Sequence, residues 1–386
     1  MNAVVPLAAI QARRRQLLCA AAGFVLPWPA AQARTIGAME PRTLVFPRDH
    51  GTHNGAKTEW WYLTGHATAA DGNVYGFQVT FFRSRVDGTE ALQSRLAAKQ
   101  LLFAHAAVTD VKGQKLWHDQ RIARWNGEPP DQATDIESPG AAFALETDTA
   151  VALRGWSMRR LPNGSYHVSV RAHEFEIEVN ALPKQALLLQ GQQGFSRKGP
   201  ETGQSSFYVS QPQLAVTGRL GLQGQSVNIA QGCAWLDHEW SEALLHPEAV
   251  GWDWIGMNLD NGDSLTAFRL RRADGSALWA GGSWRVASKS SDPMGAQIFG
   301  PGEVHFEPLR FWTSPLTQAR YPVAWRVTAP AGVFTVQALV DAQELDSRQS
   351  TGTVYWEGLS DLQGAQGQRV GRGYLEMTGY AQRLVL

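Results

Sequence analysis

Alternation of apolar and polar side chains is the dominant pattern along this chain, and it predicts strands. Phe175, Ile177 and Val179 alternate with three glutamates, which gives one apolar face and one solvated face. The pair Asn163-Gly164 stands shortly before them and is typical of a tight hairpin turn. This part of the chain is therefore expected to form an antiparallel hairpin.

Similar turn sequences recur at short intervals. They are ADGN at 70–73, VKGQ at 111–114, DNGD at 260–263 and ADGS at 273–276. Such spacing is typical of antiparallel sandwiches and barrels, and strands do not alternate with helices as a parallel sheet requires. The one segment with helical periodicity is 89–100. We therefore predict an all-β protein with little helix.

Residues 1–33 have the pattern of a signal peptide, with a charged start, a short apolar stretch and a small-residue cleavage site before Arg34. The pair Arg14-Arg15 favours the twin-arginine route over the Sec route. Cleavage after Ala33 is expected, and the mature protein is expected to be periplasmic or secreted. The rest of the chain lacks an apolar run of the roughly 18 residues that a spanning helix needs, so we do not expect an integral membrane protein.

Charge and cysteine content exclude several classes of function. Cleavage would remove three of the 35 basic residues and none of the 35 acidic ones, leaving a net charge near −3. Nucleic-acid binding is not expected, because it normally requires a basic face. Cys233 would be the single remaining cysteine, which rules out an internal disulfide and a thiolate metal site. The sequence also lacks phosphate-binding loops and a nucleophile elbow, so no cofactor is expected.

The mature length suits two domains, which we place at 41–230 and 231–386. A faint internal repeat supports this division, because 58–85 and 251–272 share an order of motifs. Each has an acid next to tryptophan, then a glycine-containing turn, then a strand ending in Arg-x-Arg. The chain contains 15 tryptophans, which suit either a well-filled core or a pocket for flat lipophilic ligands.

Strand alternation places three ionisable groups on apolar faces. Glu59 shares a face with Trp61 and Leu63, while Trp60 and Tyr62 share the other, and alternation does not show which face lines a cavity. Asp253 shares a face with Ile255, Met257 and Leu259, and His238 shares one with Ala234, Leu236 and Trp240.

Each of these groups has a structural and a functional interpretation. A carboxylate at the rim paired with arginine, or a histidine satisfied within the core, would be structural. An acid of raised pKa beside a histidine would be suited to acid–base chemistry. A weaker alternative is a metal site built on His50 and His53 in a glycine-rich loop.

Four segments resemble the secreted double-lipocalin family, which includes AttH-like proteins encoded near ABC transporters, carotenoid 1,2-hydratases and kievitone hydratase. They are FPRDHGTHNGAKTEWWYLTG at 46–65, HEW at 238–240, GWDWIGMNLDNG at 251–262 and GYLEMTGY at 373–380. The resemblance implies two tandem lipocalin-like β-barrels that hold a lipophilic ligand. It also implies a His-x-Trp pair at His238 and Trp240. The family's later Tyr-x-Asp pair has no counterpart in 264–272, so Asp253 or Glu59 would have to replace it.

These observations lead to one main hypothesis and two alternatives. The main one is a periplasmic lipocalin-like protein that binds a lipophilic small molecule such as an isoprenoid, lipid or polyketide-like compound, with hydratase (hydro-lyase) chemistry on a C=C bond as its possible activity. The expected catalytic residues are Glu59, His238, Trp240 and Asp253, and the expected ligand contacts are Trp60, Trp61, Tyr62, His105, Trp252 and Trp254. The alternatives are a carrier without catalysis that is associated with an ABC transporter, and a metal-dependent hydrolase.

Overall fold

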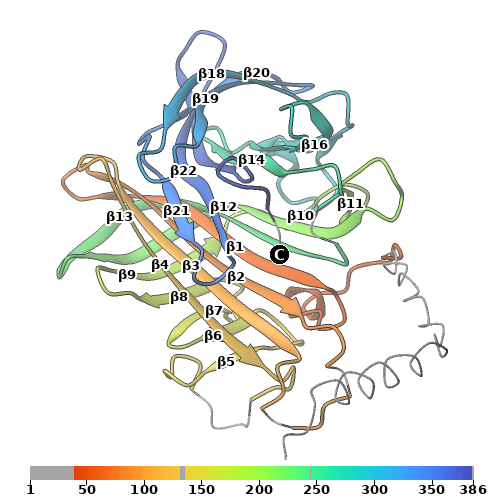
Figure 1. Cartoon of the computed structure of the whole chain (residues 1–386). Coiled ribbons are helices and arrows are strands. Elements are labelled where there is room, and N and C mark those ends of the chain that lie inside the picture. The colour runs from red at the N-terminus through yellow and green to blue at the C-terminus, as the bar shows by residue number, and fades with distance from the viewer. Residues whose placement is uncertain (1–38, 90, 95, 131–134, 244, 385–386) are drawn as a thin grey trace, which may run out of the picture. The chain divides into compact units, whose positions relative to one another are not determined.

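The computed structural model describes residues 39–384 except 90, 95, 131–134 and 244 (Figure 1). The signal peptide expected at residues 1–33 lies outside these described residues. Strands dominate the described part of the chain, which confirms the prediction of an all-β protein. Its helical elements are two short 3-10 turns, η1 (Arg48–His50) and η2 (Ala287–Lys289).

The first sheet is antiparallel and contains thirteen strands among the described residues, in the order β4-β3-β2-β1-β13-β12-β9-β8-β7-β6-β5 with β10 and β11 paired to β12. Its strands are β1 (Thr58–Ala69), β2 (Val74–Arg85), β3 (Gln100–Asp110), β4 (Lys115–Trp125), β5 (Ala142–Ala144), β6 (Ala150–Leu153), β7 (Trp156–Arg160), β8 (Tyr166–Arg171), β9 (Phe175–Pro183), β10 (Leu188–Leu189), β11 (Phe195–Arg197), β12 (Ser205–Leu222) and β13 (Gln225–Ser241). The ends of this path meet, because β4 contacts β5 and β6. The sheet therefore curls into a barrel around one core.

The second sheet is also antiparallel, in the order β17-β16-β15-β14-β23-β22-β20-β19-β18 with β21 paired to β22. Its strands are β14 (Gly251–Leu259), β15 (Ser264–Arg271), β16 (Ala277–Arg285), β17 (Gln297–Phe299), β18 (His305–Thr313), β19 (Arg320–Ala329), β20 (Gly332–Ala338), β21 (Glu344–Ser347), β22 (Thr353–Gln363) and β23 (Arg369–Met377). The two sheets correspond to the two lipocalin-like barrels that the sequence predicted.

Each of the predicted turns joins two neighbouring strands. The turn at 70–73 connects β1 to β2, and the turn at 260–263 connects β14 to β15. Residues 89–100 differ from the expectation, because the described part of this segment forms turns and bends before β3 begins. Leu92 and Leu96 on it are exposed, so a helix here would have no apolar face to bury, and short helices are unstable without such packing.

The passage from the first sheet to the second falls between Ser241 and Gly251. The boundary expected at residues 230 and 231 therefore lies inside β13. This strand cannot be divided there, because it pairs with β1 and β12 over much of its length. Within the described residues, no helix is long and apolar enough to cross a membrane.

The two sheets also pack against each other through apolar side chains. Trp61 and Leu63 of β1 point into the core of the first sheet. Tyr62, on the opposite face of the same strand, packs with Trp254 of β14 and Tyr374 of β23. One face of β1 thus packs into the core of the first sheet, and the other face packs against the second sheet.

Candidate functional site

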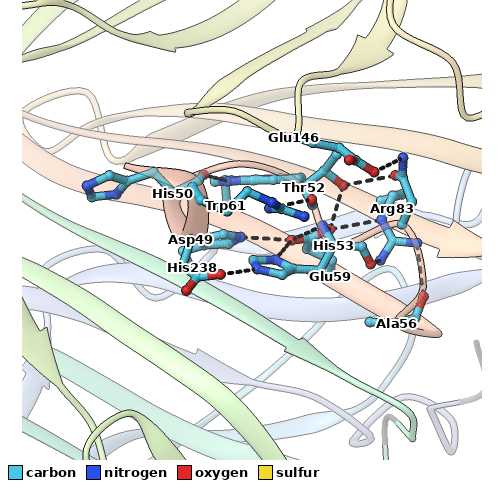
Figure 2. A network of polar contacts seen from close by, with 12 residues as sticks. Asp49, His50, Thr52, His53, Ala56, Glu59, Trp61, Arg83, Glu146 and His238 are labelled. Carbon is cyan, nitrogen blue, oxygen red and sulfur yellow. Dashed lines mark hydrogen bonds and ion pairs between the residues drawn. The ribbon is translucent and has the colours of Figure 1, made fainter. Parts of the chain in front are cut away.

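Glu59 is the centre of a buried polar network inside the first sheet (Figure 2). Its carboxylate accepts hydrogen bonds from the Thr52 hydroxyl at 2.7 Å and the Arg83 guanidinium at 2.9 Å. It also lies 2.8 Å from Nδ1 of His53 and 2.9 Å from Nε2 of His238. Glu59 and His238 therefore face the same interior, a question that alternation along β1 left open.

The charges around Glu59 keep it ionised. Burial works to raise its pKa, but Arg83, His238 and His53 outweigh that effect and hold the pKa of Glu59 well below its usual value. Burial in turn lowers the pKa of His238, so its ring is neutral at neutral pH and donates Nε2–H to Glu59. An acid held in this way cannot donate a proton near neutral pH.

The ligand atoms of His53, Glu59 and His238 lie within 4.8 Å of one another, which is close enough for a metal ion to bridge them. His50 is not part of this group and instead packs against Phe46 with ring centroids 4.7 Å apart. Arg83 already supplies a cation to Glu59, and a metal ion at the same carboxylate would meet its positive charge. The arrangement favours an ion-paired network over a metal centre.

Asp253 holds the equivalent position in the second sheet. It pairs across the strands with Arg269, just as Glu59 pairs with Arg83, which gives the faint sequence repeat a structural meaning. Nε of Arg269 lies 2.7 Å from its carboxylate, and the hydroxyl of Tyr380 donates to it at 2.8 Å. Asp253 is thus paired with arginine inside the second sheet, away from the Glu59 network.

Trp61 and Trp240 also belong to the interior of the first sheet. Trp61 is buried, stacks on His238 at 4.8 Å and donates its indole N–H to the carbonyl oxygen of His50. Trp240 stacks on His53 with ring centroids 3.7 Å apart. Neither tryptophan lines either of the two cavities described below.

The remaining predicted aromatic contacts meet at a cavity of about 350 Å³ between the two sheets, here called the inner cavity. Trp60 and Tyr62 reach it from β1, and Trp252 and Trp254 reach it from β14. His105 of β3 lies beside it and joins the sheets, because its ring nitrogens contact the Tyr355 hydroxyl and the Ser350 hydroxyl, each at 2.8 Å. The structure thus brings Trp60, Tyr62, Trp252 and Trp254 together at one cavity, a convergence that the sequence did not show.

Five carboxyl groups line the inner cavity together with these aromatic rings. One is Glu59, and the other four were not among the predicted site residues. They are Asp237, Glu239, Glu357 and Glu376. Asp237 accepts hydrogen bonds from the Ser210 hydroxyl at 2.5 Å and from the Tyr208 hydroxyl and Trp235 indole at 2.7 Å each. Burial nevertheless raises the pKa of Asp237 to about 7.

Glu357 and Glu376 face each other on adjacent strands, β22 and β23. Burial raises the pKa of Glu376 to about 7, and burial together with the neighbouring charge of Glu376 raises the pKa of Glu357 well above its usual value. Two carboxyl groups so placed cannot both ionise readily, and they titrate as a pair. This pair therefore retains a proton at neutral pH.

A signal for this pair is present in the sequence. Glu357 shares a predicted strand face with Tyr355 and Leu359, as Glu59 does with Trp61 and Leu63. Glu376 lies within the segment 373–380 that carries the family resemblance. Alternation could therefore have marked both acids, but only the pairing of β22 with β23 brings them together.

A second, more open cavity of about 680 Å³, here called the outer groove, adjoins the inner cavity. Tyr208 and Phe268 line both spaces. Lys198 stands at this wall with its ammonium group 4.3 Å from the Tyr208 ring centroid and 4.5 Å from that of Phe268. Nζ of Lys198 also lies 3.0 Å from the Glu239 carboxylate.

Two antiparallel lipocalin-like sheets, with an aromatic, acid-lined cavity between them, place this chain in the class of double-lipocalin proteins. The AttH-like family model matches residues 37–380, so the chain belongs to the AttH-like family. A crystal structure described as AttH of Nitrosomonas europaea is 42% identical, covers 89% of this chain and 99% of its own, and has a TM-score of 0.78. No curated protein matches the sequence.

More distant structures share the fold alone. Kievitone hydratase of Nectria haematococca is 12% identical with a TM-score of 0.62, and the match covers 89% of this chain and 98% of the hydratase. The structure of CghA with Sch210972 is 14% identical with a TM-score of 0.52, over 90% of this chain and 96% of CghA.

Proposed function

We propose that the protein binds a lipophilic alkene, such as an isoprenoid, in the inner cavity and adds water to its C=C bond. The observation that supports this most is the Glu357–Glu376 pair, which keeps a proton beside an aromatic cavity. A neutral carboxylic acid in an apolar pocket is suited to proton donation. The pair takes the donor role that the sequence suggested for Glu59 or Asp253, because both of those carboxylates are held by arginine.

The first step is protonation of the alkene. The proton of the pair moves to one alkene carbon, so an O–H bond breaks and a C–H bond forms with the π electrons. Positive charge then develops on the more substituted carbon. The faces of Trp60, Trp252 and Trp254 can stabilise that charge, as can the carboxylate left behind.

The second step is addition of water. A water molecule forms a C–O bond with the carbocation and loses a proton, which returns to the carboxylate pair and restores it. Asp237 is the other candidate base, since its pKa of about 7 suits proton acceptance near neutral pH. Tyr208 connects this group to the cavity wall, because it donates to Asp237 and accepts from the Trp254 indole at 3.1 Å.

His238 and Trp240 have a supporting role in this proposal. Both lie on the face of β13 opposite Asp237 and Glu239, inside the first sheet. His238 contacts Glu59 through a hydrogen bond, and Trp240 stacks on His53. These contacts hold the start of β1, the strand that carries Trp60 and Tyr62, in position. The export expected from residues 1–33 would place this activity in the periplasm.

Incubating the purified protein with prenylated phenols in water labelled with heavy oxygen tests the proposal. The expected product contains one labelled water, and Glu357→Gln should lower the rate by about 10²–10⁴-fold while ligand binding persists. Glu176→Gln, on the exposed face of β9, is the matched control and should leave the rate unchanged. Wild-type protein that binds these alkenes without hydrating any would contradict the hydratase. That result would favour a carrier that serves an ABC transporter.

A further inference from the structure

The charges around the inner cavity do not balance. Its wall includes the cations Lys198 and Arg83, and each is already paired, Lys198 with Glu239 and Arg83 with Glu59. The other three carboxyl groups, Asp237, Glu357 and Glu376, form no ion pair with any described lysine, arginine or histidine. The cavity thus has an excess of acidic groups.

Glu357 also has hydrogen-bonding capacity that the described residues leave unused. Its side chain is buried, with the residue 3% exposed, and Oε1 has no hydrogen-bond partner among the described residues. The hydroxyl of Tyr62, which lines the same cavity, lies near enough to Glu357 to offset part of the rise that burial causes in its pKa, but forms no hydrogen bond of ordinary geometry with any described residue. Burying such groups without partners is unfavourable, so an amine that donates a hydrogen bond to Glu357 would gain affinity.

The aromatic wall of the cavity is suited to positive charge. Its rings include Trp60, Tyr62, Phe82, Trp252, Trp254 and Tyr355. Ring faces carry negative potential and attract cations placed over them. The protein already binds one ammonium group in this way at the same cavity, since that of Lys198 lies over Tyr208 and Phe268.

We infer that the inner cavity binds a lipophilic organic cation, either an amine or a quaternary ammonium compound, with its charge against Glu357, Glu376 and the faces of Trp252 and Trp254. A volume of about 350 Å³ suits a ligand of one or two rings. The inference rests on the site of the proposed function, because a stable cation would occupy the place of the carbocation. It does not require turnover.

Binding of the cation should depend on pH in a defined direction. The groups facing Glu357 and Glu376 are Tyr62 of β1, Tyr355 of β22, Tyr374 of β23, and Asp237 and Glu239 of β13. The tyrosines stay neutral, because burial raises their pKa values. As pH rises through about 7 the carboxyl groups ionise, and affinity for a cation should increase. Below that range, binding should release protons.

A matched pair of probes tests this inference without any reaction. The two are meta-hydroxyphenyl trimethylammonium and its neutral isostere meta-tert-butylphenol, which differ in charge and hardly in shape. Calorimetry on wild-type protein at a pH above about 7 should show the cation binding at least about tenfold more tightly than the isostere. Repeating the titration near pH 6 to 7 in buffers of different ionisation enthalpy should reveal proton release.

The double variant Glu357→Gln and Glu376→Gln should lose the preference for the cation, while Glu176→Gln should retain it. Equal or tighter binding of the neutral isostere to wild type would overturn the inference, as would failure of both probes to bind. Because these tests use wild-type protein, they hold even if the double variant does not fold. Cation binding without alkene hydration would support this inference and contradict the hydratase, and hydration without cation preference would do the reverse.

Discussion

Glu59 and Asp253 show how one residue pattern is used twice. Each is an acid next to a tryptophan near the start of a central strand, and each faces an arginine on the next strand. The pairing satisfies a charge that could not otherwise be buried. These two acids therefore hold the strand starts together, and the proton chemistry that we propose would fall to acids on the opposite faces of the two sheets.

Replacing Glu59 by Gln should destabilise the protein strongly. The side chains of Glu59 and Arg83 are both fully buried, so the substitution leaves a buried guanidinium without its counter-charge. We expect a loss of about 3–5 kcal/mol in the free energy of unfolding, measured by denaturant titration. Glu176→Gln serves as the exposed control. A loss below about 1 kcal/mol for Glu59→Gln would show that the Glu59–Arg83 pair contributes little to the free energy of unfolding.

The sequence predicts which residues share a strand face, but it does not predict which strands pack against that face. Alternation grouped Glu59 with Trp61 and Leu63 without showing that this face is the interior one. It put Asp237 and Glu239 beside Trp235, on the face opposite His238. It could not show that this second face meets another sheet. The inner cavity exists only because β1 and β13 pack against β14, β22 and β23, and that contact has no local signature in the sequence.

At the scale of elements, the pairing of β14 with β23 places Glu376 opposite Trp254, so that both residues reach the inner cavity. Gly373 of β23 lies in close contact with the backbone of β14, directly opposite Met257. A Cβ at this position would collide with the carbonyl oxygen of Gly256. The close approach of the two strands therefore depends on glycine.

Gly373→Ala should push β23 away from β14 and disturb the carboxyl pair. We expect a loss of roughly 1–3 kcal/mol or more in the free energy of unfolding, together with weaker ligand binding in the inner cavity. Gly302→Ala is the matched control, because a Cβ there meets no atom within 4 Å. Equal stability of the two variants would mean that the strand pair can widen without cost.

Predictions of turns were confirmed, because local sequence determines them. The helix predicted at 89–100 was wrong, because its formation depends on packing. Turn sequences such as those at 70–73 and 260–263 specify hairpins by themselves. Residues 89–100 have helical periodicity, but their leucines find no surface to pack against. The boundary expected at residues 230 and 231 falls within β13, which begins in a polar, exposed stretch and becomes a central buried strand only after Cys233.

For the whole molecule, the stability should depend on pH in two ways, because one buried acid has a lowered pKa and others have raised pKa values. Arg83 and two histidines depress the pKa of Glu59 despite its burial, so its stabilising contribution is present above its usual pKa and is lost as pH falls toward the depressed value. The pKa values of Asp237 and Glu376 are raised from 3.8 and 4.5 to about 7. The stabilising contribution of these two protonated acids is fully present below their usual pKa values and is lost as pH rises to about 7.

The free energy of unfolding should therefore be highest at mildly acidic pH and fall as pH approaches about 7. The expected decrease is on the order of 1–3 kcal/mol for each raised group, toward the lower end for the partly exposed Glu376. Denaturant titrations across this range would measure it. Asp237→Asn or Glu376→Gln should flatten the curve. A wild-type stability that rises steadily over the same range would contradict these raised pKa values.

The proton held by Glu357 and Glu376 at neutral pH is the central claim, and infrared spectroscopy of protein with isotope-labelled glutamate tests it most directly. A protonated carboxyl group has a carbonyl band distinct from that of a carboxylate. At a pH of about 7 the wild-type spectrum should contain this band, shifted by the label, and it should vanish at higher pH and in the double variant Glu357→Gln and Glu376→Gln. A wild-type spectrum without the band, or a band that survives in the double variant, would contradict the claim.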